Sequence, residues 1–222
     1  MMRTRINNDS RDTDGLKVDG SKLTCIAWFK LADLISRKEK EKALSLYRLI
    51  SHSFENKAYT LQVEGDILWS MEDKRALERY TQAAYLYKKE KNLIASIAVY
   101  EHLLTMEPQN FDYLKTLILF YLFLSWPEKF EENYLKAFFL LDQGFIDQNQ
   151  LLDFTKSIIG FSVNTRKLNL HQFEQEYEVE LKEPKEYFWI TKTLTSILKR
   201  TNNSFYKIVK KYCLDRELNF DS

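Results

Sequence analysis

The segment 77–110 constrains the fold most, because its pattern predicts a helix, a short break and a second helix that ends before Pro108. Proline lacks an amide hydrogen and clashes with the preceding helical turn, so it ends a helix. Ala83, Ala84 and Ser96 place small side chains where two antiparallel helices would have to approach closely. The segment therefore predicts interlocked helices, although it names no reaction and no ligand.

The scarcity of helix breakers extends this prediction to the whole chain. Its 222 residues include five glycines and three prolines, too few for a many-stranded β fold with a turn about every ten residues. Apolar residues make up 45% of the chain, which is enough for a sizeable core. We therefore predict an all-α protein.

Apolar periodicity and capping residues predict where these helices begin and end. Ser125 and Glu128 have the spacing of a capping box, so we expect Ser125 to cap a helix that carries Pro127 in its first turn. Gly144 is expected to end that helix. The expected helices cover about residues 58–71, 74–89, 93–106, 111–124 and 128–141.

The composition predicts three parts of the chain. Residues 1–21 are polar with few apolar side chains and are expected to form a flexible tail. Residues 22–146 carry the regular helical pattern, and residues 147–222 are expected to form a helical region that caps it. Within that region, residues 168–181 fit a helix, although residues 177–181 also alternate like a short strand.

Aromatic, small and proline residues recur at fixed places when Leu77 is taken as the first position of a unit of about 34 residues. They are Tyr80, Ala83, Ala84, Tyr87, Ser96, Tyr100, Leu103 and Pro108. A second unit from Phe111 places Leu114, Leu117, Ile118 and Tyr121 alike. The pattern resembles the tetratricopeptide repeat (TPR) over roughly residues 24–142. This resemblance implies a right-handed α-solenoid of antiparallel helix pairs, extended by a nonstandard helical C-terminal region.

A competing frame of the repeat begins at Ala58. This frame places Gly65 where the family pattern has a glycine in the first helix. Ala76, Tyr80 and Ala83 then fall along the second helix, and the turn between the two helices is one residue short. Both frames use the helix around Tyr80, so they cannot both be regular. A further alternative is a generic helical bundle whose apolar stripes coincide with the family pattern.

By resemblance, the first helix of each pair lines a concave surface that receives an extended peptide or a helix of a partner protein. The family's clamp for a terminal carboxylate is not expected here, because Asn92 and Asn110 fall in turns. We therefore expect a non-enzymatic interaction scaffold that uses no cofactor. The groove-facing candidates are Thr81, Gln82, Tyr85, Lys88, Lys89, Asp112, Lys115, Thr116 and Leu119.

Two other functions stay open. An enzyme of unrecognised class would need converging ionisable groups, and His52, His102 and His171 are the histidines available. His171 could share a helical face with Glu174 and Glu178, but no matching set for a carboxylate-bridged metal site is visible. An RNA-binding adaptor would use basic and aromatic residues interleaved near the C-terminus. They are Lys199, Arg200, Phe205, Tyr206, Lys207, Lys210, Lys211, Tyr212 and Arg216.

Charge, cysteines and hydropathy bound the environment. Lysine and arginine total 33 against 32 acidic residues, so no global field attracts nucleic acid or anionic lipid. Cys25 and Cys213 lie at opposite ends without a local partner, which favours a reducing, cytoplasmic location.

The apolar run from Leu117 to Leu124 is shorter than the roughly 20 residues of a membrane span. We expect residues 147–222 to cover this run; the alternatives are a groove for a partner helix or a self-association surface.

Overall fold

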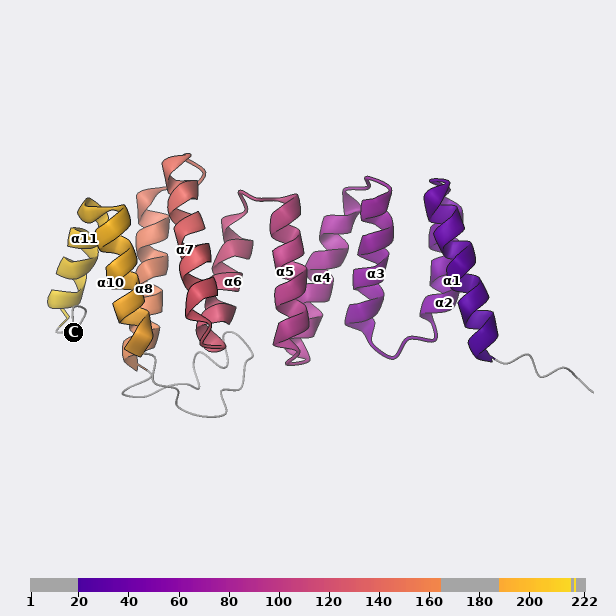
Figure 1. Cartoon of the computed structure of the whole chain (residues 1–222), viewed down its shortest axis with the longest axis horizontal. Helices are drawn as coiled ribbons and strands as arrows, with labels where there is room; N and C mark the ends of the chain where they lie inside the picture. Colours follow the sequence, from indigo (N-terminus) through magenta and orange to yellow (C-terminus); the bar gives the residue numbers. More distant parts are fainter. Residues whose placement is uncertain (1–19, 165–187, 217, 219–222) are drawn as a thin grey trace, which may run out of the picture. The chain divides into compact units, whose positions relative to one another are not determined.

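The computed structural model describes residues 20–164, 188–216 and 218 of the chain. Every regular element within these residues is a helix (Figure 1), which confirms the predicted all-α class. None of these helices is both long enough and apolar enough to cross a membrane. The helix-or-strand alternative at residues 168–181 lies outside the described residues, as does most of the predicted tail.

The chain divides into two compact units, Met1–Ser53 and Phe54–Ser222. The division falls within the predicted repeat region 22–146. In the first unit, α1 (Gly20–Ser36) packs against α2 (Lys40–Ser51). The buried apolar residues of this unit are Leu31, Leu34, Ala43, Leu44, Tyr47 and Ile50.

In the second unit, each helix from α3 to α7 packs against the next helix along the chain. The bounds of these five helices agree with the sequence prediction within one residue at each end. The helices α8, α10 and α11 follow and also pack against one another. The bounds are α3 Lys57–Ser70, α4 Arg75–Lys89, α5 Leu93–Met106, α6 Phe111–Phe123, α7 Pro127–Asp142, α8 Gln148–Asn164, α10 Phe188–Thr201 and α11 Asn203–Leu214.

Asparagine side chains begin several of these helices. The Oδ1 atoms of Asn56, Asn92, Asn110 and Asn202 accept hydrogen bonds from amides in the first turns of α3, α5, α6 and α11. Asparagine is among the best N-cap residues, because its short side chain satisfies an amide that has no partner within the helix. These caps fix the starts of α3, α5, α6 and α11.

The capping role predicted for Ser125 is wrong. Trp126 is the N-cap of α7, without a side-chain hydrogen bond, and Pro127 occupies the first turn. Ser125 instead completes the end of α6, where its amide donates to the carbonyl of Leu122 and the Trp126 amide donates to the carbonyl of Tyr121. These two bonds form a Schellman motif, which requires a left-handed residue. Ser125 is that residue, with a φ of 54°.

Left-handed residues also lie in the turns α1–α2, α3–α4, α4–α5 and α7–α8. Lys38, Glu72 and Lys91 have φ angles of 57°, 57° and 61°, and Gly144 has a φ of 74°. Gly144 has no Cβ atom and adopts this conformation freely. In the three lysine and glutamate residues the Cβ atom makes the left-handed region costly, by about 1 kcal/mol or more each. The chain thus makes tight helix–helix turns with few glycines.

Lys91→Gly is expected to raise the free energy of unfolding by about 0.5–1 kcal/mol, because relief of about 1–2 kcal/mol of left-handed strain exceeds the extra backbone entropy that glycine loses on folding. The matched control is Lys89→Gly in the last turn of α4, where we expect a loss of about 1 kcal/mol. Urea denaturation followed by circular dichroism measures both changes. A loss at position 91 as large as that at position 89 would contradict the left-handed assignment.

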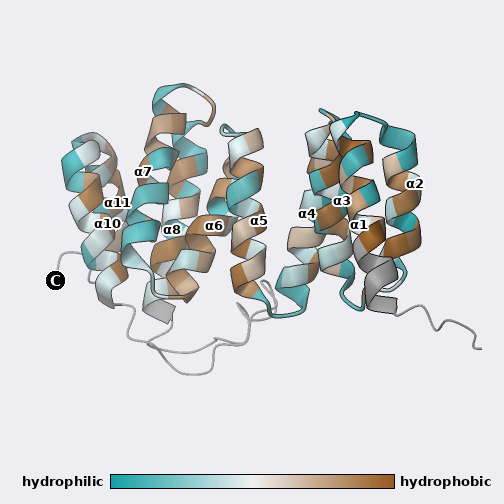
Figure 2. Cartoon of the chain, turned by 45° about the vertical axis from the view of Figure 1, so that its right-hand side comes forward, coloured by the Kyte–Doolittle hydropathy of each residue, from teal (hydrophilic) through white to brown (hydrophobic). Residues whose placement is uncertain are grey.

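The run from Leu117 to Phe123 is the core of the second unit, because none of its residues is more than 6% exposed. Most of α6 carries the hydrophobic colour in Figure 2. Aromatic rings join α6 and α7 to the later helices. The ring contacts are Phe111–Phe154 and Phe123–Phe161 to α8, Phe130–Trp189 to α10, and Phe138–Phe205 to α11.

Candidate functional site

Five of the predicted groove residues lie on α4: Thr81, Gln82, Tyr85, Lys88 and Lys89. Tyr85 is exposed, and the Nζ atom of Lys88 lies 6.0 Å from the centroid of its ring. The hydroxyl of Thr81 lies 3.2 Å from the hydroxyl of Tyr113, at hydrogen-bonding distance. Thr81 therefore contributes to a contact between α4 and α6 rather than to an open surface.

The other four predicted residues, Asp112, Lys115, Thr116 and Leu119, line a hollow of about 600 Å³ between α6 and α8. None of the five α4 residues lines it. The structure thus brings together four of the nine predicted residues. We call this space the α6–α8 hollow; it is lined by Gln109, Phe111, Asp112, Lys115, Thr116, Leu119, Phe145, Ile146, Gln150, Asp153, Phe154 and Ser157.

The α6–α8 hollow combines buried apolar residues with charged walls. Leu119, Ile146 and Phe154 are buried apolar residues of its lining. On the α6 wall, Lys115 pairs with Asp112 at 2.7 Å, and its Nζ atom lies 5.1 Å from the centroid of the Phe111 ring. Both signs of charge are present, so the hollow suits peptide side chains held by shape and a few polar contacts.

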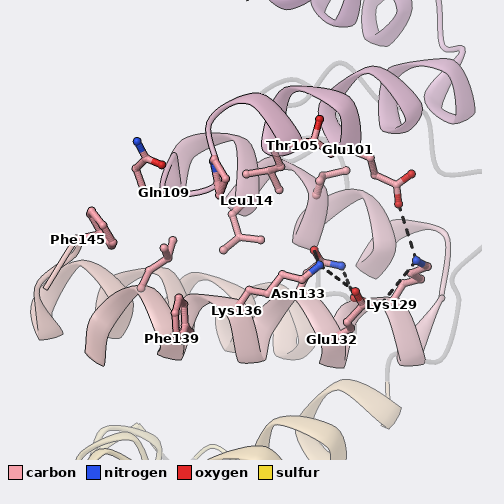
Figure 3. Close-up of a pocket in the computed structure, with 14 residues that line it drawn as sticks. Glu101, Thr105, Gln109, Leu114, Lys129, Glu132, Asn133, Lys136, Phe139 and Phe145 are labelled. Atoms are coloured by element: carbon pink, nitrogen blue, oxygen red, sulfur yellow. Dashed lines mark hydrogen bonds and ion pairs between the residues drawn. The ribbon is translucent and has the colours of Figure 1, made fainter. Parts of the chain in front are cut away.

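A second cavity, of about 430 Å³, lies between α5, α6 and α7 and was not predicted from the sequence (Figure 3). We call it the α5–α7 pocket. It is lined by Glu101, Leu104, Thr105, Pro108, Gln109, Leu114, Leu117, Lys129, Glu132, Asn133, Lys136, Phe139, Leu140 and Phe145. Its volume lies within the range typical of ligand pockets.

One end of the α5–α7 pocket is polar and internally paired. Lys136 donates to Glu132 at 2.9 Å, and this bond, with the nearby charge of Lys129, lowers the pKa of the Glu132 carboxyl. The buried side chain of Asn133 donates to the carbonyl of Lys129 and accepts from Lys136. Glu101 lies 4.0 Å from Lys129. The charges of Glu101 and Glu132 balance those of Lys129 and Lys136, so this end of the pocket favours neither an anionic nor a cationic ligand.

The other end of the α5–α7 pocket presents exposed aromatic rings. Phe139 is 61% exposed and Phe145 is 58% exposed. Figure 3 shows both rings at the end opposite Glu101 and Lys129. Phe139 could have been noticed in the sequence, because it falls outside the buried stripe of α7 that includes Tyr134.

Buried tyrosines tie the helices together through hydrogen bonds to carboxylates. The Tyr80 hydroxyl donates to Asp66 at 2.7 Å, and the Tyr121 hydroxyl donates to Glu101 at 2.6 Å. Burial, followed by the carboxylate partner, raises the pKa of both tyrosines well above the usual value. Both hydroxyls therefore stay protonated and act as hydrogen-bond donors.

The described residues do not assemble a metal-binding cluster. Among them, no group of three or more His, Cys, Asp and Glu side chains is placed to hold a metal ion. His52 is exposed at the end of α2, and the ring of His102 packs 4.7 Å from that of Tyr80. His171, Glu174 and the rest of that candidate set lie outside the described residues.

Comparisons with protein-family models, with curated proteins and with solved structures find no match to this chain. The resemblance to the TPR family therefore rests on the residues of this chain alone.

Proposed function

We propose that the chain is a non-enzymatic protein-docking module, built from TPR-like antiparallel helix pairs, that holds an extended peptide or a helix of a partner in the α6–α8 hollow. The observation that carries the proposal is that four residues chosen from one repeat unit line a single hollow with residues of α8. A hollow of about 600 Å³ has room for several peptide side chains.

The contacts around α4 support the repeat arrangement. In the frame that begins at Ala58, Gly65 lies so close to the Tyr80 ring that an added Cβ would sit 2.9 Å from it. In the frame that begins at Leu77, the buried hydroxyl of Ser96 donates to the carbonyl of Ala84 at 2.9 Å. Both contacts join repeat positions, so α4 serves as the second helix of one pair and the first helix of the next. An array with one shared helix explains why neither frame is regular.

The position of the hollow fits the first helices of successive pairs. If α4–α5 and α6–α7 are pairs, α4 and α6 are first helices, and the Thr81–Tyr113 hydrogen bond joins them. The next first helix is α8, which forms the other wall of the α6–α8 hollow. Solenoid repeats expose such a row of helices as an extended binding surface.

The proposal predicts that filling the α6–α8 hollow abolishes peptide binding. Peptides selected from a displayed random library on the whole chain should bind Thr116→Arg/Ser157→Arg at least about tenfold more weakly, because two long charged side chains would occupy the hollow. Fluorescence anisotropy with the selected peptides measures this change.

The control is Ser45→Arg/Ser70→Arg, which adds the same charge at two exposed serines outside both cavities. This variant should bind within about twofold of the unmodified chain. Circular dichroism establishes that each variant is folded. The proposal fails if no peptide is selected, or if the selected peptides bind both double variants equally well.

A further inference from the structure

The last two described helices concentrate positive charge on a protein that is almost neutral overall. Residues 188–216 include seven basic residues and one acidic residue, Asp215, whereas the whole chain has 33 basic and 32 acidic residues. One of the seven, Arg200, pairs with Glu131 of α7 at 2.6 Å. The others are Lys192, Lys199, Lys207, Lys210, Lys211 and Arg216.

Two tyrosine rings gather cations from different helices into one region. The Nζ atoms of Lys199, on α10, and Lys210, on α11, lie 5.1 and 5.9 Å from the centroid of the Tyr206 ring. At Tyr212, the guanidinium carbon of Arg216 lies 4.1 Å from the ring centroid. Such cation–π contacts hold like charges close together, which raises the local positive potential.

The same contacts weaken the case for RNA binding by base stacking. Stacking requires an exposed aromatic face. Phe205 and Tyr206 are buried, and Tyr212 is half-buried with a guanidinium over its ring. The aromatic residues that suggested an RNA adaptor in the sequence therefore offer no open stacking platform.

The outer side of α11 adds apolar groups to this positive region. Lys207 and Lys211 are exposed one helical turn apart, and neither forms an ion pair with a described residue. Ile208 and Leu214, at 41% and 65% exposure, flank these lysines on the exposed half of α11, about 120° apart around the helix axis. We call these four residues, Lys207, Ile208, Lys211 and Leu214, the α11 outer stripe. Exposed aliphatic groups beside lysines suit a partner that is both acidic and apolar.

We propose that the α11 outer stripe docks an acidic amphipathic segment of a partner protein. Its carboxylates pair with Lys207 and Lys211, and its apolar side chains cover Ile208 and Leu214. A phosphate backbone would leave the two aliphatic side chains uncovered. A membrane surface requires a wider apolar face than two aliphatic residues provide.

This surface shares no residue with the α6–α8 hollow, so the two proposals can fail independently. The probe is a fluorescein-labelled helical peptide with glutamate on one face and leucine on the other, titrated with the whole chain and followed by anisotropy. The expected result is salt-sensitive binding that weakens at least about tenfold in Lys207→Gln/Lys211→Gln and in Ile208→Ser/Leu214→Ser. A peptide with serine in place of leucine should bind as weakly as the second variant does.

Two variants serve as controls. Lys57→Gln/Lys74→Gln removes two exposed lysines from α3 and the start of α4 and should leave the affinity within about twofold. Lys207→Arg/Lys211→Arg keeps the charge and should retain binding. Oligouridine and vesicles of phosphatidylcholine with phosphatidylserine are titrated in parallel.

The proposal is overturned if the unmodified chain does not bind the peptide or if the lysine variant binds it equally well. It is also overturned if the aliphatic variant binds equally well, because the recognition is then charge alone. Lysine-dependent binding of oligouridine or vesicles without binding of the peptide would assign the surface to another class of partner and overturn it too.

Discussion

Phe130→Ala is expected to lower the free energy of unfolding by about 3–5 kcal/mol, since it removes a fully buried aromatic ring. Phe130 is 0% exposed on α7. Its ring stacks on that of Tyr134 at 5.8 Å and meets the edge of Trp189, on α10, at 5.3 Å. Truncation would therefore leave a cavity where α7 packs against α10, and neighbouring aromatic rings cannot collapse to fill it.

The matched control on the same helix is Phe139→Ala. Phe139 is exposed at the α5–α7 pocket, so its loss should change the free energy of unfolding by no more than about 0.5 kcal/mol. Urea denaturation, followed by circular dichroism at several protein concentrations, measures both variants. A loss below about 1 kcal/mol for Phe130→Ala would mean that α10 does not pack on α7 as described. A concentration-dependent loss at Phe139 would instead indicate that a second copy covers this ring.

The sequence predicted the helices from α3 to α7 because their signals are local. The Oδ1 atoms of Asn56, Asn92 and Asn110 accept hydrogen bonds from amides two or three residues ahead, and Pro127 fits a first turn without any tertiary contact. Ser125 was misassigned because two helix ends compete for one short turn. Its residue type favours a cap of α7, but closing α6 requires a left-handed residue at that position.

The α6 wall of the candidate site could be predicted because helical periodicity is also a local signal. Helical periodicity places Asp112, Lys115 and Thr116 on one side of α6, and that side faces the hollow. Periodicity does not give the distance between the hollow and the side of α4 that carries Thr81 and Tyr85. That distance depends on how α4 packs against α6, where Thr81 meets Tyr113. The α5–α7 pocket was missed because a space bounded by three helices leaves no periodic signal in any one of them.

Gly65→Val is expected to cost about 3 kcal/mol of stability, and Gly65→Ala about 1 kcal/mol, because the added carbon overlaps the Tyr80 ring. An ideal Cβ at position 65 would lie 2.9–3.1 Å from three ring atoms. The ring cannot swing away, because Tyr80 is buried, donates to Asp66 and packs against His102. Alanine costs less than valine because its better helix propensity offsets part of the overlap.

Gly160→Ala is the matched control, because Gly160 also lies within a helix and, apart from its chain neighbours and the backbone of its own helix, no atom of the described residues lies within 4 Å of the added carbon. Helix propensity alone should then raise stability by about 0.5–1 kcal/mol. Thermal unfolding of both alanine variants measures the contrast. Equal gains at the two positions would mean that α3 and α4 do not approach closely at Tyr80.

Combining Gly65→Ala with Tyr80→Leu extends the argument from stability to the frame of the repeat. If the glycine exists to admit the ring, the cost of Gly65→Ala should fall by about 1 kcal/mol or more once the ring is gone. Such coupling would favour the frame that begins at Ala58, in which these two residues occupy paired repeat positions. Additive costs would leave the Gly65–Tyr80 approach without an energetic role, and the Ser96–Ala84 hydrogen bond alone would then support a place for α4 in a repeat pair.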